Sequence, residues 1–98
     1  MGLVRLVLAG ARLKGARLAE ATLSRADLSY ADLREADLTG VDLTRTKLVG
    51  ADFTGATLTN ATLDGAEIDQ AIFKGAIGMD RVRGLDTTVG RDTAIFER

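Results

Sequence analysis

The sequence predicts an all-β solenoid, a short rod of stacked square coils, and two repeating features carry this prediction. A large apolar residue recurs at every fifth position, without exception, from Leu8 to Phe73. A small residue lies two positions before each of them from Leu13 onward, beginning with Ala11. Because positions two apart share one side of an extended segment, both residues point toward the axis of the same coil.

A period of five excludes the two common alternatives. It fits neither an α-helix, with about 3.6 residues per turn, nor a single strand, with a period of two. On a helix these leucines would be spread around the whole circumference and would share no buried face. Four pentapeptides instead close a square coil of twenty residues. Coils stacked about 4.8 Å apart pair their backbone N–H and C=O groups.

The remaining repeat positions fit the corners and the packing of such a coil. Glycine often occupies the last position, where a tight turn benefits from a positive φ. These glycines are Gly10, Gly15, Gly40, Gly50, Gly55, Gly65 and Gly75, and Asn60 fits the same role. Leu6, Val41 and Thr46 are the exceptions at the small position. Proline is absent, as expected if every backbone N–H is needed.

The N-terminal end is predicted to start directly in register. Leu3 occupies the first apolar position, and Val4 and Val7 take outward positions. An open solenoid end exposes core and unpaired backbone, which caps or partners normally cover. End-to-end association, a partner chain and a frayed coil in water all fit this sequence.

The C-terminal segment, residues 78–98, is predicted to be a non-repeat cap over a solenoid of residues 1–77, with a possible role in oligomerisation. A short helix is expected near 80–83 and an extended segment near 93–96. Outward Ile72 and Ile77 suggest an exposed apolar patch at the same end, which would mark an interface. The apolar residues expected to fold over the last coil are Val82, Leu85, Val89, Ile95 and Phe96.

Composition excludes most catalytic sites. The chain has no cysteine and no histidine, so the commonest general base and the thiolate metal ligands are missing. We predict a protein that is not an enzyme and that holds no cofactor and no metal. The balance of 13 basic and 14 acidic residues predicts no direct binding to nucleic acid. Arg5 interrupts the only N-terminal apolar run, so we expect a cytoplasmic protein that does not bind a membrane.

Residues twenty apart become neighbours in adjacent coils, which turns the sequence into a surface map. Opposite charges then alternate along the rod, with Arg12 next to Asp32 and Arg17 next to Asp37. We assign these pairs to solubility and register, because an exposed ion pair contributes only about 0–1 kcal/mol.

One corner carries like charges instead. Arg5, Arg25 and Arg45 are twenty apart and would form a stripe with a spacing of about 5 Å. Three cations so close repel one another unless counterions or stacking offset the repulsion. The stripe is therefore either the contact site for an acidic partner or a solvated edge with its side chains splayed apart.

Segments such as ADLSY, ADLRE, ADLTG and ADFTG resemble the A-(D/N)-L-X-X pentapeptide-repeat family. The resemblance covers residues 1–77 and implies a right-handed quadrilateral β-helix of about four coils. Val41 and Thr46 depart from the pattern at the small position. Arg12, Arg17 and Lys47 stand where the family favours Asp or Asn.

The function expected is a structural or protein–protein interaction module with an unidentified protein partner. The resemblance also implies a homodimer through the C-terminal end. As an alternative, some members mimic duplex DNA, bind type II topoisomerases and protect them from quinolones. A rod of four coils matches a length of duplex that carries roughly eleven negative charges. This chain has a net charge of −1, which disfavours the alternative.

Overall fold

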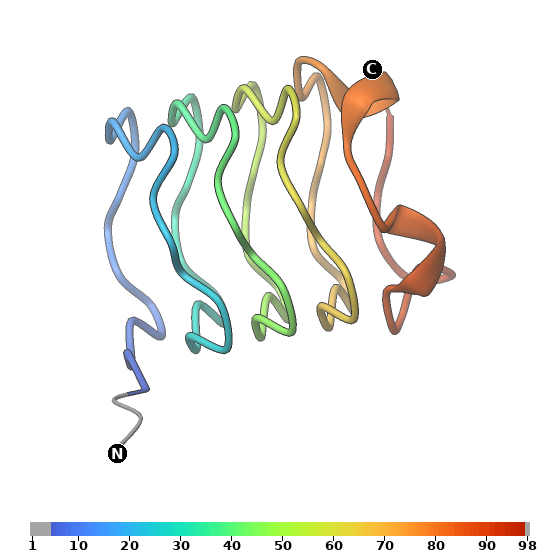
Figure 1. The fold of residues 1–98 in the computed structure, drawn as a ribbon, viewed down its shortest axis with the longest axis horizontal. Helices are drawn as coiled ribbons and strands as arrows, with labels where there is room; N and C mark the ends of the chain where they lie inside the picture. Colours follow the sequence, from blue (N-terminus) through green and yellow to red (C-terminus); the bar gives the residue numbers. More distant parts are fainter. Residues whose placement is uncertain (1–4, 98) are drawn as a thin grey trace.

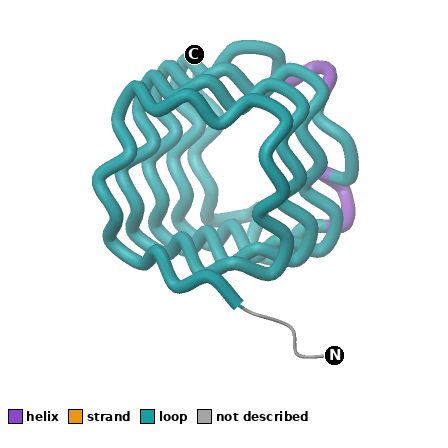
Figure 2. Tube along the Cα trace, turned by 60° about the vertical axis from the view of Figure 1, so that its left-hand side comes forward, coloured by secondary structure: helices purple, strands orange, loops and turns teal. Residues whose placement is uncertain are grey.

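The chain winds into a stack of coils joined by parallel backbone pairing. In the computed structural model, which describes residues 5–97, every bridge from Val7–Asp27 to Thr57–Ile77 joins residues twenty positions apart. The coils lie side by side along the long axis (Figure 1) and share a roughly four-sided outline (Figure 2). The pairing therefore has the predicted register, while Leu3 and Val4 of the predicted N-terminal coil lie outside the described residues.

Each side of a coil is too short to form a strand. Residues 5–97 contain only isolated parallel bridges and two short 3-10 helices. Asp32 N donates to Ala11 O at 2.9 Å, and Leu13 N donates to Asp32 O at 2.8 Å. The bridging residue thus pairs in both directions with an adjacent coil, so the fold is β by its hydrogen bonding even though a corner interrupts every side.

A tight turn closes each corner. Ala31 N donates to Leu28 O at 3.0 Å, and Tyr30 between them has a φ of 61°. A positive φ at the third residue is what a type II turn requires. The Asp27 carboxylate supports this turn by accepting the backbone N–H of Ser29 at 3.1 Å. Asp32, Asp37, Asp42 and Asp52 make the equivalent contact, which explains the frequent Asp before the central leucine.

The interior is filled by the predicted apolar positions. The central residues from Leu28 to Phe73 and nearly all the small residues between them are buried, most with no exposed surface. Thr46, at a small position, is also fully buried. Its hydroxyl donates to Leu23 O at 3.0 Å, so burial leaves no unpaired donor.

Three phenylalanines form a column inside the rod. The rings of Phe53 and Phe73 are nearly parallel, with centroids 4.9 Å apart. Phe96 continues the stack, with its centroid 5.3 Å from that of Phe73. Phe96 therefore occupies a central repeat position, although it lies 23 residues after Phe73 rather than twenty.

The backbone pairing continues past residue 77 with longer corners. Bridges join Thr62 to Arg83, Glu67 to Val89 and Ile72 to Ile95, so the separation grows from 21 to 22 to 23 residues. Each of these three sides has gained one residue. The predicted cap and the count of about four coils are not confirmed, because the pairing crosses the boundary at which the solenoid was expected to end.

A repeat of six residues explains the longer corners. The units GMDRVR, GLDTTV and GRDTAI each begin with a glycine, and Gly78, Gly84 and Gly90 have φ values of 82°, 79° and 88°. The 3-10 helices η1 (Met79–Arg81) and η2 (Leu85–Thr87) follow the first two glycines. The expectation that this segment contains no repeat is therefore wrong. Its half-buried Met79 and Leu85 pack on the core.

A pair of glycine substitutions tests the close contact between the last two coils. A Cβ at Gly84 would lie 2.8 Å from the backbone nitrogen of Asp64, whereas a Cβ at Gly75 would meet nothing within 4 Å. Both glycines have a positive φ. We expect Gly75→Ala to lower the free energy of unfolding by about 1 kcal/mol and Gly84→Ala by roughly 2–4 kcal/mol. Equal losses in urea denaturation would contradict this account.

Candidate functional site

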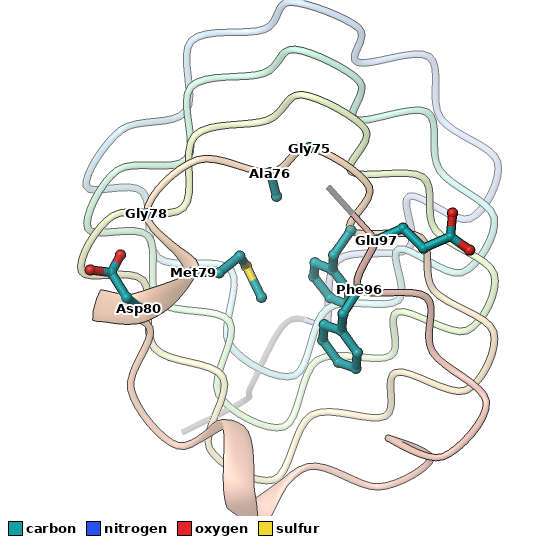
Figure 3. Close-up of a pocket in the computed structure, with 8 residues that line it drawn as sticks. Gly75, Ala76, Gly78, Met79, Asp80, Phe96 and Glu97 are labelled. Atoms are coloured by element: carbon teal, nitrogen blue, oxygen red, sulfur yellow. The ribbon is translucent and has the colours of Figure 1, made fainter.

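The C-terminal end of the rod carries a hollow lined by both apolar and polar groups. It has a volume of about 420 Å³, and its lining includes Phe73, Ala76, Met79 and Phe96. Figure 3 shows Met79 and Phe96 pointing toward the interior from different sides, while Asp80 and Glu97 point away from it. The exposed fraction of Phe96 is 42%. We name this region the C-terminal hollow.

The structure distributes the predicted C-terminal interface residues over several surfaces. Phe96 lines the C-terminal hollow, whereas half-buried Val82 and Leu85 pack on the core beside it. Ile72 and Ile95 are bridge partners on one side of the rod, and exposed Ile77 lies on the next side. Ile72 and Ile77 thus lie on adjacent sides of the rod, and an apolar patch formed by these two residues stays a prediction.

Met79 lines the C-terminal hollow, which the sequence analysis did not predict. The signal was present in the six-residue period, because Met79 and Leu85 each follow the leading glycine of a unit. Once Gly78 and Gly84 are recognised as equivalent, both side chains are expected at equivalent places in the last coil. The period of five hid this equivalence.

Several backbone groups of the last coil lack hydrogen-bond partners. In earlier coils the central residue donates its N–H to the next coil, as Leu13 does to Asp32. Among residues 5–97 the corresponding N–H groups of Gly84, Gly90 and Phe96 make no hydrogen bond, and neither do the carbonyls of Thr88 and Ala94. This end therefore presents donors and acceptors together, as an open β edge does.

The second surface is the predicted arginine stripe, which the structure does bring together. Arg5, Arg25 and Arg45 line a shallow groove of about 260 Å³, and Lys47 joins them from the adjoining side. We name these four residues the basic corner. Within the described part of the chain, none of them lies within 4.0 Å of a carboxylate oxygen.

Two ion pairs lie elsewhere on the rod within residues 5–97. The Arg34 guanidinium lies 2.8 Å from the Asp32 carboxylate, and Lys14 lies 3.9 Å from Glu35. The hydrogen bonds from the Arg34 side chain and backbone lower the pKa of Asp32 to about 2. The backbone N–H of Ser29 is the main cause of the lowered pKa of Asp27, with smaller contributions from Lys47 and Arg5.

Two further findings concern metal binding and membrane spanning. No cluster of three acidic residues in residues 5–97 is arranged to hold a metal ion. That part of the chain also has no helix long and apolar enough to cross a membrane. The two candidate sites are therefore the C-terminal hollow and the basic corner.

Comparison with known families agrees with the repeat geometry. The family model described as pentapeptide repeats (8 copies) matches residues 3–40 and 36–75. The chain belongs to the pentapeptide repeat family. Proteins of this family have a β-helix fold and are generally not catalytic. A search of curated proteins found no match.

Solved pentapeptide repeat proteins share the architecture. A protein from the thylakoid lumen of Arabidopsis thaliana is 30% identical, with a TM-score of 0.59, over 79% of this chain and 61% of that one. Rfr23 from the cyanobacterium Cyanothece 51142 is 26% identical, with a TM-score of 0.51, over 99% of this chain and 67% of Rfr23. HetL from Nostoc sp. strain PCC 7120 is involved in heterocyst differentiation regulation. It is 24% identical, with a TM-score of 0.52, over 97% of this chain and 57% of HetL. The chain thus spans about 61% of the length of the first of these proteins.

Arg25 and Arg45 of this pentapeptide repeat protein have a strained backbone conformation, which a glycine substitution tests. Arg45 has a φ of 57°, in the left-handed region that glycine adopts without penalty. We expect Arg45→Gly to raise the free energy of unfolding by about 0.5–1 kcal/mol. Lys74→Gly removes the same charge at a residue without a positive φ and should lower stability by about 0.5–1 kcal/mol. Loss of stability in both variants would contradict the assignment of strain.

Stability should fall in acid as the turn carboxylates become protonated. The pKa values of Asp27, Asp32 and Asp37 are lowered in the folded protein, so it binds fewer protons than the unfolded chain above about pH 2. This stabilisation is complete above about pH 4 and is lost as the pH falls toward 2. Urea midpoints across this range should fall less steeply for Asp32→Asn than for the wild type. An unchanged slope would contradict the role of Asp32, and Asp80→Asn controls for loss of one charge.

Proposed function

We propose that this pentapeptide repeat protein is a non-catalytic protein–protein interaction module that forms a homodimer through its C-terminal end. The observation that carries the proposal is the C-terminal hollow, where the half-exposed Phe96 ring lies beside unpaired backbone groups. An apolar surface next to an open β edge favours burial against another protein. The module then binds its protein partner as a rigid rod.

A second copy suits this end because the edge is self-complementary. Each of two sides offers an N–H and a C=O, namely Gly90 with Thr88 and Phe96 with Ala94. A two-fold axis places the same patch on both subunits, so each donor can meet an acceptor of the other copy. The two Phe96 rings would meet near that axis and extend the aromatic column across the interface.

Mimicry of duplex DNA, the alternative drawn from the resemblance, has no observation in its favour. The bridges place Arg12 next to Asp32 and Arg17 next to Asp37, so basic residues interrupt the acidic positions. The basic corner adds four cations along another edge. We therefore carry only the interaction module forward, and the predicted cytoplasmic location stays a prediction.

The oligomeric state tests the dimer. Sedimentation velocity should give about twice the monomer mass of 10.4 kDa at high micromolar concentration. Phe96→Glu should return the protein to a monomer, because two carboxylates would be buried together near the axis. Val7→Glu, at a residue that is 72% exposed near the other end, is the matched control and should leave the dimer intact. A monomeric wild type would contradict the dimer.

The interaction function is tested separately by affinity capture from the source cells followed by mass spectrometry. We expect one protein to be enriched in an amount comparable to that of the immobilised module. Its recovery should depend on the folded rod, with heat-unfolded protein as the control. No enrichment over that control would contradict the proposed function, whatever the oligomeric state.

A further inference from the structure

The basic corner differs from the other corners in how its side chains follow one another along the rod. Corner residues twenty apart form four columns, and every corner residue from Gly10 to Gly75 has a positive φ. In three columns no two successive residues are both larger than glycine. These columns read Gly10–Tyr30–Gly50–Gln70, Gly15–Glu35–Gly55–Gly75 and Glu20–Gly40–Asn60. The fourth column holds three successive arginines before Gly65.

A physical reason underlies the alternation with glycine. The side chain at one corner lies over the corner of the next coil. A Cβ at Gly50 would be 2.5 Å from the Tyr30 ring, and one at Gly40 would be 2.7 Å from the Glu20 carboxyl carbon. The contact is looser in the other two columns, where Arg45 Cγ would be 3.3 Å from a Cβ at Gly65 and Glu35 Cγ would be 3.5 Å from one at Gly55. Tyr30 and Glu20 therefore occupy space that a side chain at the next corner of their columns would need.

The arginine column breaks this rule and also concentrates charge. Arg25 and Arg45 occupy the same corner in adjacent coils, and both have the left-handed φ that disfavours side chains. Lys47 adds a fourth cation to the same groove. Asp27 and Glu67 are its bridge partners, but the Asp27 carboxylate already accepts the Ser29 N–H. Backbone strain and like-charge repulsion thus coincide at one place.

We propose that the basic corner binds an extended acidic peptide segment of a partner protein, lying along the column. Carboxylates satisfy the planar, two-pronged donor set of arginine. Same-side residues of an extended peptide are about 6.6–6.8 Å apart, and the coils are about 4.8 Å apart. The long arginine side chains absorb this difference, so alternate acidic residues meet Arg5, Arg25 and Arg45. This surface lies on the side of the rod, and the proposal does not depend on the C-terminal dimer.

Nucleic acid fits the groove less well than a peptide. Single strands are held by aromatic side chains that stack on bases, in addition to cations. Arginine and lysine alone line this groove, and the exposed Tyr30 belongs to another column. A carboxylate ligand needs only the cations that are present.

Fluorescence anisotropy with a labelled peptide of alternating glutamate and serine tests the proposal at low salt, where screening is weak. We expect saturable binding that Arg25→Gln with Arg45→Gln weakens about tenfold, equivalent to about 1.4 kcal/mol. Arg12→Gln with Arg17→Gln removes the same charge from other sides and should weaken binding less than about threefold. A peptide with glutamine in place of glutamate should not bind.

Several outcomes would overturn the proposal. They are equal losses in the two double variants, absence of saturable binding by the wild type, and tighter binding of an oligothymidylate of equal charge than of the acidic peptide. Arg25→Gly with Arg45→Gly guards against a folding artefact, because this variant should be more stable than the wild type and still lose binding. Binding retained by that variant would also count against the basic corner.

Discussion

The twenty-residue register of the backbone pairing is the constraint on which the rest of this structure depends. Asp32 illustrates this register. Its backbone N–H and C=O form hydrogen bonds with residues of the preceding coil, while its own side chain faces outward. Each side of a coil makes a single bridge to each neighbouring coil, which is too little pairing to fix the position of that side by itself. The register is maintained because every coil also places a central apolar residue and a small residue inside. An insertion in one pentapeptide must therefore be accommodated at a corner.

The corners show how the chain accommodates this constraint. A positive φ recurs at the end of every pentapeptide from Gly10 to Gly75, whichever residue stands there. Glycine is free of strain in this conformation, but a corner side chain can also lie over a glycine in the next coil, as Tyr30 does over Gly50. The size of the residue that fits at one corner thus depends on the size of the residue at the corner twenty positions away. The arginine column is unusual because successive corners both carry large side chains, and not only because it gathers positive charge.

The sequence predicted the register, the inward positions and the arginine stripe, because each follows from spacing alone. Thr46 could be placed inside by the period, although its bond to Leu23 O could not be foreseen. The prediction failed where the period changed. Gly78, Gly84 and Gly90 mark six-residue units, and a search limited to five treats them as an irregular tail. Lys47 was also missed as part of the basic corner, because its place depends on where a side chain lies rather than on its column.

The change from five to six residues also explains why the two candidate surfaces are separate. Along the pentapeptide part, columns of side chains run straight because each coil repeats the one before it, and the arginines use such a column. In the six-residue units Gly84 and Gly90 directly follow a bridging residue, and their missing Cβ atoms let the last coil approach the backbone of Asp64 and Asp69 closely. The exposed apolar side chains of this last coil are Val89, Ile95 and Phe96. One change in repeat length therefore ends the lateral columns and separates the basic corner from the C-terminal hollow.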